Sequence, residues 1–244
     1  MRSRGWLQAL LGGSLVALGA VAFAAPGDLL AYWPMDSARD GVVVDASGRG
    51  HDATYGAADK APPTFVPGMV GQALKLTAAQ EGYLTVAHSE DFNFTGPFTV
   101  MAWVKPAERS ASYEVLCFKG DRAGDPPWPG WRLRLGWSRA WFDVGTPDGR
   151  EVRFSSPEWS VPVGYWSHVA ATWDGKKLRI LVNAAEAASV DFAGPIAPRT
   201  DRRPLTIANY QGRKNAYPYQ GLLDEVKVFT RALTEDEVFA EARP

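Results

Sequence analysis

Two segments of this sequence combine flat aromatic rings with polar side chains, which is the mixture that carbohydrate recognition requires. They cover residues 119–131 and 209–219. The side chains that we expect to contact a ligand there are Arg122, Trp128, Tyr210, Arg213, Asn215 and Tyr217. An aromatic ring can cover the apolar face of a sugar, while guanidinium, amide and hydroxyl groups can bond its hydroxyls. Trp137 and Trp141 flank a turn and are candidates for a further aromatic platform.

Core packing is the competing interpretation of an aromatic residue in a β protein. We prefer it for four tryptophans that lie in segments with a strand pattern, namely Trp33, Trp103, Trp166 and Trp173. Trp128 lies instead in a proline-rich segment, where strand pairing is disfavoured. For Trp128, burial and exposure to a ligand both stay open.

The residue patterns of common hydrolases do not occur in this sequence. The three histidines have no ligand-like spacing, and there is no Gly-x-Ser-x-Gly segment. Asp224 and Glu225 are adjacent, so in a strand they face opposite sides and cannot form the carboxylate pair of a glycosidase. Cys117 lies in an alternating pattern and is interpreted as a packed, unreactive thiol. The sequence therefore predicts a binding protein and not an enzyme.

The charge and the cysteine content further limit the class of partner and the ways in which the fold can be stabilised. The 244 residues carry a formal net charge of −1 with both signs interspersed, which lacks the basic excess that a nucleic-acid partner requires. Cys117 is the only cysteine, so no disulfide within the chain can stabilise the fold. We expect a glycan or an extracellular protein as partner, and no nucleic acid.

The first residues have the layout of a secretory signal. Arg2 and Arg4 precede an apolar run that reaches Phe23, and Ala22-Phe23-Ala24 offers the small-x-small pattern of a cleavage site. We therefore expect residues 1–24 to be a signal peptide and residues 25–244 to be one domain. The expected location is secreted or periplasmic, with no stable membrane span after cleavage. Retention of the run as an uncleaved anchor stays open as the alternative.

Beyond this run, the apolar residues recur at every second position, which predicts strands. Asp148-Gly149 and Asp174-Gly175 each separate two such runs and predict tight hairpins. The segments expected as strands are 29–33, 73–76, 83–87, 98–104, 113–118, 131–135, 140–145, 151–155, 166–173, 178–182, 205–208 and 222–229. A single short helix is expected from Glu235 to Ala240, because Thr234 and Glu237 have the spacing of a capping box.

Five segments, in this order, together resemble the laminin-G-like, concanavalin A-like lectin jelly-roll superfamily. They are Leu30–Asp36 with Asp45–Ala53, Val70–Leu76 with Tyr83–Val86, Phe98–Pro106, Trp166–Gly175, and Tyr219–Phe229 with Arg231–Thr234. The resemblance implies an all-β, antiparallel two-sheet jelly-roll sandwich closed by the short C-terminal helix. It implies function only weakly, because this fold hosts lectins, adhesion modules and some glycosidases.

Asp224 is the residue whose expected surroundings are least suited to its charge. In the strand 222–229 it would share a face with Leu222, Val226 and Val228, where a carboxylate is costly unless it is paired or bound to a cation. The family resemblance implies a structural Ca²⁺ held between Asp36, at the end of the first strand, and Asp224. The alternative is that Asp224 accepts hydrogen bonds from backbone amides of the N-terminal loop, and both stay open. We expect the loop 45–52 to bond its own backbone.

Together these observations predict a secreted or periplasmic lectin-like module that binds glycan through loops at one rim or through the concave sheet. A protein-interaction or cell-surface adhesion module of the same fold is the first alternative. A glycoside hydrolase or lyase with an unrecognised site is the second.

Overall fold

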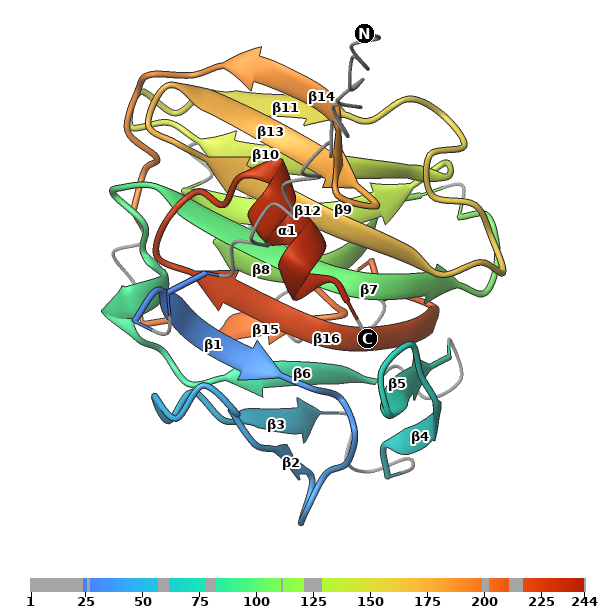
Figure 1. Cartoon of the computed structure of the whole chain (residues 1–244). Coiled ribbons are helices and arrows are strands. Elements are labelled where there is room, and N and C mark those ends of the chain that lie inside the picture. The colour runs from blue at the N-terminus through green and yellow to red at the C-terminus, as the bar shows by residue number, and fades with distance from the viewer. Residues whose placement is uncertain are drawn as a thin grey trace, which may run out of the picture.

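Two antiparallel β-sheets packed face to face make up the chain in the computed structural model (Figure 1). The structure describes residues 24–25, 27–56, 62–77, 82–110, 112–120, 129–198, 202–210 and 217–243. Within these ranges all strand pairing is antiparallel, and one short α-helix follows the last strand. The fold class predicted from the sequence is therefore confirmed.

Each sheet has eight strands. Sheet A runs, in spatial order, β14 (Ala185–Asp191), β13 (Lys177–Val182), β12 (Ser167–Trp173), β7 (Phe98–Pro106), β16 (Gly221–Phe229), β5 (Gln72–Leu76) and β4 (Thr64–Pro67), with β1 (Leu29–Trp33) also pairing with β16. Sheet B runs β11 (Glu151–Ser155), β10 (Arg139–Gly145), β9 (Gly130–Gly136), β8 (Glu114–Gly120), β15 (Leu205–Ile207), β6 (Tyr83–Val86), β3 (Ala53–Gly56) and β2 (Val42–Val43).

The core lies between the sheets and is filled by every second residue of each strand. In β7, the inward residues are Phe98, Val100, Ala102 and Val104. Phe98 packs against Trp131 of sheet B with ring centroids 5.4 Å apart. Burying a side chain of this size stabilises the fold by about 1.5–3 kcal/mol, so the alternating pattern also decides which face of each strand turns to solvent.

The structure confirms the predicted burial of two of the four tryptophans expected in the core. For the other two the prediction was wrong. Trp33 and Trp173 are buried. Trp103 is only half-buried, because the inward positions of β7 leave it on the outer face of sheet A, where its indole donates to the Ala242 carbonyl at 3.0 Å. Trp166 is also half-buried, because it precedes β12 and does not belong to it.

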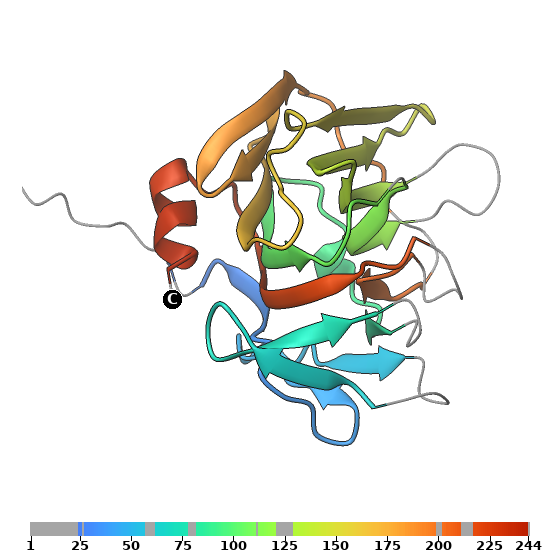
Figure 2. The same ribbon diagram turned by 90° about the vertical axis from the view of Figure 1, so that its right-hand side faces the viewer.

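The outer face of sheet A is covered by the helix α1 (Glu235–Glu241). Figure 2 shows α1 on one side of the two sheets, with sheet B on the other side. The predicted capping box is present: Thr234 caps the Glu237 amide, and the Glu237 carboxylate accepts from the Thr234 amide. Val238 faces the sheet and is buried there. A 3-10 helix at Glu90–Phe92 was not predicted.

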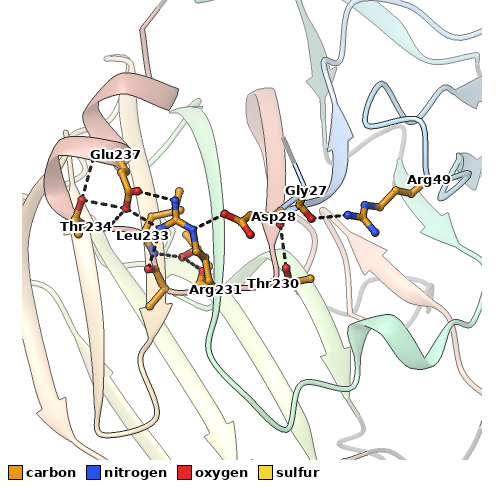
Figure 3. Close-up of polar contacts among 10 residues, drawn as sticks. Gly27, Asp28, Arg49, Thr230, Arg231, Leu233, Thr234 and Glu237 are labelled. Carbon is orange, nitrogen blue, oxygen red and sulfur yellow. Dashed lines mark hydrogen bonds and ion pairs between the residues drawn. The ribbon is translucent and has the colours of Figure 1, made fainter. Parts of the chain in front are cut away.

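Two arginine side chains form hydrogen bonds and ion pairs with the segment that leads into β1, beside this helix (Figure 3). Arg231 donates to Asp28 at 2.6 Å and forms a two-pronged pair with Glu237. The guanidinium of Arg49 donates to the carbonyl oxygens of Gly27 and Leu29. Both ends of the described chain are therefore fixed on the sheet A side of the molecule, and sheet B is left free of them.

Candidate functional site

The outer face of sheet B carries charged and aromatic side chains. In β9, Trp131 and Leu133 face the core, so Arg132 and Arg134 face outward. In β10, Phe142 faces the core, which turns Trp141 and Asp143 outward beside them. In β11, the same alternation turns Glu151 and Arg153 outward. The hairpin register therefore gathers three guanidinium groups and two carboxylates on one face.

These charges form a buried network around Asp143. The Asp143 carboxylate is fully buried and accepts from Arg134 and from Arg153 at 2.7 Å each, with Arg132 3.5 Å away. Glu151 pairs with Arg132 and Arg153. Burial lowers the pKa of Arg134 to about 10, and the neighbouring Asp143 carboxylate opposes that effect. Arg134 therefore stays charged at neutral pH, and its position is fixed.

An aromatic cluster lies directly on this network. The Arg134 guanidinium carbon is 3.7 Å from the ring centroid of Tyr113, which is a close cation–π contact. Tyr113 is surrounded edge-on by Trp137 at 4.9 Å, Trp141 at 5.4 Å and Tyr217 at 6.5 Å. We call these four rings the aromatic cluster. The charged network therefore contacts the aromatic cluster through Tyr113, which lies against both Arg134 and Arg153.

A pocket of about 380 Å³ opens in the aromatic cluster. Tyr113, Trp137, Arg139, Trp141 and Glu158 line it. The Glu158 carboxylate accepts from Arg139 at 3.1 Å, and the indole of Trp141 donates to the carbonyl of Gly136 at 3.2 Å. The pocket thus presents aromatic rings together with a guanidinium and a carboxylate, which is the mixture that a sugar requires.

A larger hollow of about 620 Å³ lies at the other end of β10, between residues 146–152 and 191–195. Its one aromatic side chain, Phe192, is buried. This hollow therefore lacks the three half-buried aromatic rings that line the pocket in the aromatic cluster.

The turn that carries Trp137 has an unfavourable backbone conformation. Trp137 and Ser138 connect β9 to β10 and have φ angles of 53° and 59°. Such a two-residue turn favours Asn-Gly, because bulky residues rarely adopt positive φ. Hydrogen bonds from the Trp137 amide to Ser110 and from the Val161 amide to Ser138 hold it. A tryptophan is therefore placed here at a conformational cost, and its ring lines the pocket.

Of the six ligand-contacting residues predicted from the sequence, the structure describes two. Trp128, Arg122, Arg213 and Asn215 lie outside the described residues. Tyr217 belongs to the aromatic cluster and is 38% exposed. Tyr210 is buried, with its ring stacked on Phe118 at 4.6 Å and edge-on to Tyr217 at 5.9 Å.

All six of these contacts stay predictions. Sequence reasoning named Trp137 and Trp141 as a further platform and missed Tyr113, Arg139 and Glu158. The sequence did contain a signal for the charged outer face. In the predicted strands before and after the Asp148-Gly149 turn, charged residues alternate with apolar ones, namely Arg132, Arg134, Asp143 and Arg153.

Asp36 and Asp224 meet at one turn. Asp224 accepts from the amides of Met69 at 2.8 Å and Val70 at 3.0 Å, and Asp36 accepts from the Gln72 amide at 2.7 Å. The amide alternative predicted for Asp224 therefore holds for one of its oxygens, but the amides belong to the turn between β4 and β5 and not to the N-terminal loop. The other oxygen, Oδ1, is buried and has no hydrogen bond of normal geometry among the described residues.

The apolar face predicted for Asp224 is wrong. A bulge between Asp224 and Lys227 adds one residue to β16, and Glu225 adopts a φ of 50° there. Val226 and Val228 consequently face the core, whereas Asp224 pairs in register with the outward-facing Trp103. Burial raises the pKa of Asp224 to about 6, which shows that the two amide hydrogen bonds do not fully offset its desolvation.

Space around the two carboxylates is tight. A Cβ on Gly68 would lie 2.6 Å from Asp224, and one on Gly71 would lie 2.3 Å from Asp36. The turn therefore needs glycine at both positions for the carboxylates to approach. Within the described residues there is no cluster of three or more acidic, histidine or cysteine ligands, so a metal here would also need backbone carbonyls.

Two other sequence interpretations are confirmed. The loop 45–52 bonds its own backbone, because Asp45 accepts from the amides of Ser47 and His51. Cys117 is buried between the sheets, and burial raises the pKa of its thiol far above the usual range. A buried thiol with this pKa stays protonated and unreactive.

Comparison with protein families decides the assignment. The family model for the concanavalin A-like lectin/glucanases superfamily matches residues 78–239. The chain belongs to the concanavalin A-like lectin/glucanases superfamily. The laminin-G-like resemblance read from five segments is thereby confirmed. A search of curated protein sequences found no match.

Solved structures show the same fold at low sequence identity. Domain 4 of AbnA, an extracellular arabinanase from Geobacillus stearothermophilus solved with arabinotriose, is 18% identical, with a TM-score of 0.65, and the match covers 88% of this chain and 98% of that domain. The binding domain of botulinum neurotoxin serotype G is 14% identical, with a TM-score of 0.66, over 87% of this chain and 50% of that one.

The binding domain of Paraclostridial Mosquitocidal Protein 1 is 16% identical, with a TM-score of 0.62, over 88% of this chain and 52% of that one. This chain thus spans about half the length of the toxin domains and nearly all of the arabinanase domain. Among the described residues, no helix is long and apolar enough to cross a membrane.

Replacing Asp143 with Asn tests the buried network. We expect the free energy of unfolding to fall by about 3–5 kcal/mol, because the substitution leaves buried guanidinium groups without their shared carboxylate. Urea unfolding measures the change. Asp148→Asn is the matched control: its pair with Arg150 is exposed and screened by solvent, so its loss should change the free energy of unfolding far less. Equal effects of the two substitutions would contradict the network's role.

Proposed function

We propose that this chain is a non-catalytic carbohydrate-binding module that holds a glycan in the pocket of the aromatic cluster. The observation that carries the proposal is the pocket lined by Tyr113, Trp137 and Trp141 beside Arg139 and Glu158. Its volume of about 380 Å³ lies within the range of about 300–1,000 Å³ that small-molecule sites occupy.

The arrangement suits a sugar for two physical reasons. The ring faces of Trp137 and Trp141 can cover the apolar C–H face of a pyranose or furanose, and this burial provides most of the affinity. Arg139 donates and Glu158 accepts, so the two side chains can bond sugar hydroxyls from one side of the pocket. The side chains already pair with each other at 3.1 Å, which orders them before a ligand arrives.

The comparisons support this proposal at the level of the fold. The arabinanase domain, which this chain matches over almost its whole length, was solved with an oligosaccharide. The binding domains of Paraclostridial Mosquitocidal Protein 1 and of botulinum neurotoxin serotype G share the architecture. Export of this chain from the cytoplasm remains a proposal as well, supported by the signal-like layout of residues 1–24 and by the extracellular arabinanase.

Removal of the pocket rings tests the proposed function. We expect Trp141→Ala and Trp137→Asn each to weaken glycan binding by tenfold or more, since each removes about 1.4 kcal/mol or more of ring contact. Asn is chosen at position 137 because it adopts positive φ readily, so relief of the turn offsets part of the packing that is lost with the indole. A glycan array that includes arabinotriose, followed by calorimetric titration of the strongest hit, measures the affinity.

Phe239→Ala is the matched control for these variants. Phe239 is an exposed aromatic residue on α1, on the opposite side of the molecule, so its removal should leave glycan affinity unchanged. Wild-type affinity in Trp137→Asn and Trp141→Ala, or a loss in Phe239→Ala alone, would place the site elsewhere.

We also propose that Asp36 and Asp224 hold a structural Ca²⁺. The residues fit such an ion, because two carboxylates bond one turn and the buried Oδ1 of Asp224 has no hydrogen bond of normal geometry among the described residues. Calcium accepts carboxylates and backbone carbonyls in flexible geometry. Bound Ca²⁺ would offset the cost of burying the Asp224 carboxylate and tie β1 and β16 to the turn between β4 and β5.

Calorimetric melting in excess Ca²⁺ and in excess EDTA tests the calcium proposal. We expect the wild-type melting temperature to be higher in Ca²⁺, by an amount that corresponds to about 2.7 kcal/mol when the ion is a hundredfold above its dissociation constant. Asp224→Asn keeps an oxygen for the Met69 and Val70 amides and should abolish the shift. Asp174→Asn, in an exposed turn, is the control that should retain it. No wild-type shift would remove the calcium proposal and leave the glycan site untouched.

A further inference from the structure

A second tryptophan with an unfavourable backbone conformation lies beside the pocket. Trp159 has a φ of 66° and is 61% exposed. It belongs to the turn at residues 157–160, where the Ser160 amide donates to Pro157. Glycine or asparagine would adopt positive φ in an exposed turn at a lower conformational energy than tryptophan does. A tryptophan at this position therefore carries a backbone cost that a glycine or asparagine would avoid.

The backbone joins this turn to the one that carries Trp137. The Val161 amide donates to the Ser138 carbonyl at 3.1 Å, and the Ser156 amide donates to Ala140 at 2.9 Å. The chain on either side of Trp159 is thus hydrogen-bonded along the turn between β9 and β10. Both unfavourable tryptophans lie on the same rim of sheet B.

Side chains connect the two tryptophans as well. Glu158 lines the pocket and accepts from Arg139 at 3.1 Å on one oxygen and from Arg109 at 2.7 Å on the other. The Arg109 guanidinium lies 4.9 Å from the ring centroid of Trp159. Arg139, Glu158 and Arg109 therefore form a row of polar side chains from the pocket to the ring of Trp159. This ring is largely exposed to solvent.

We propose that Trp159 and Arg109 form a second sugar subsite, continuous with the pocket, so that the ligand is an extended oligosaccharide or polysaccharide chain and not a single terminal sugar. The inference rests on the proposed glycan function of the pocket. One sugar ring occupies the pocket against Trp137 and Trp141. The chain passes over Arg139 and Glu158, whose donors and acceptor match hydroxyls, and a later sugar stacks on Trp159.

A chain-length series tests the second subsite. The probes are arabinose, arabinotriose and longer arabinan oligosaccharides, together with matching ladders of any other backbone that a glycan array identifies. For wild-type protein we expect calorimetric affinity to rise with chain length until both subsites are filled. Trp159→Ala should lower affinity for the long chains by about tenfold and leave affinity for the shortest binding probe unchanged. Phe239→Ala should change neither.

Four outcomes would overturn the second subsite, and they differ in what they imply for the pocket. Equal wild-type affinity for short and long chains shows that only the pocket binds, as does wild-type affinity for long chains in Trp159→Ala. An equal loss at all lengths in Trp159→Ala shows that Trp159 supports the pocket itself. Absence of binding to every probe by folded wild-type protein overturns the glycan function together with its second subsite. Unfolding free energies of both variants establish that each is folded.

Discussion

The candidate site depends on one buried carboxylate. Asp143 lies on the outer face of a sheet, a position where solvent normally screens a charge, yet it is fully buried beneath guanidinium groups. It fixes Arg134, whose guanidinium lies under the ring of Tyr113, and Tyr113 in turn is surrounded by Trp137 and Trp141. Because a hydrogen-bonded network fixes Arg134, the Tyr113 ring that lies on it keeps a fixed position at the surface of the sheet, and Trp137 and Trp141 pack against that ring.

The two outer faces of the sandwich are used differently. On sheet A, α1 and the start of the fold cover the surface, with Arg231 joining Asp28 to Glu237. On sheet B, the network and the aromatic cluster occupy the corresponding surface and leave a pocket. Both termini of the described chain lie on the covered side (Figure 2). The described chain therefore begins and ends on the side opposite the face that we assign to the glycan.

Much of the fold could be predicted from the sequence because the sandwich core imposes a period of two. The Asp148-Gly149 and Asp174-Gly175 turns join the strand pairs expected of them, and the capping box starts α1 at the expected residue. The short strands β2, β3 and β4 were not predicted. Strand β14 was also missed, because its small residues, mainly alanine and serine, show little β preference. The face of Asp224 was mispredicted for another reason: a bulge at Glu225 shifts the alternation, and only strand pairing reveals a bulge.

The site was less predictable than the fold. Aromatic and polar residues in two loops were the visible signal, but Tyr113, Arg139 and Glu158 come from three segments whose meeting depends on strand register and on turn contacts. The two tryptophans at positive φ, Trp137 and Trp159, could not be recognised either, because nothing in the sequence records that a turn residue is strained. Strain at an exposed aromatic residue is visible only in the structure, and here it marks the rim that we assign to ligand binding.

We assign glycan binding to the open face of sheet B, at the aromatic cluster. A titration of indole-labelled protein with the strongest oligosaccharide hit, followed by NMR, tests this assignment directly, with resonances assigned through Trp137→Asn and Trp141→Ala. We expect saturable shifts of the Trp137 and Trp141 indole signals and no shift at Trp103, which lies on the covered face of sheet A. Shifts confined to Trp103, with those of Trp137 and Trp141 unchanged at saturation, would contradict it.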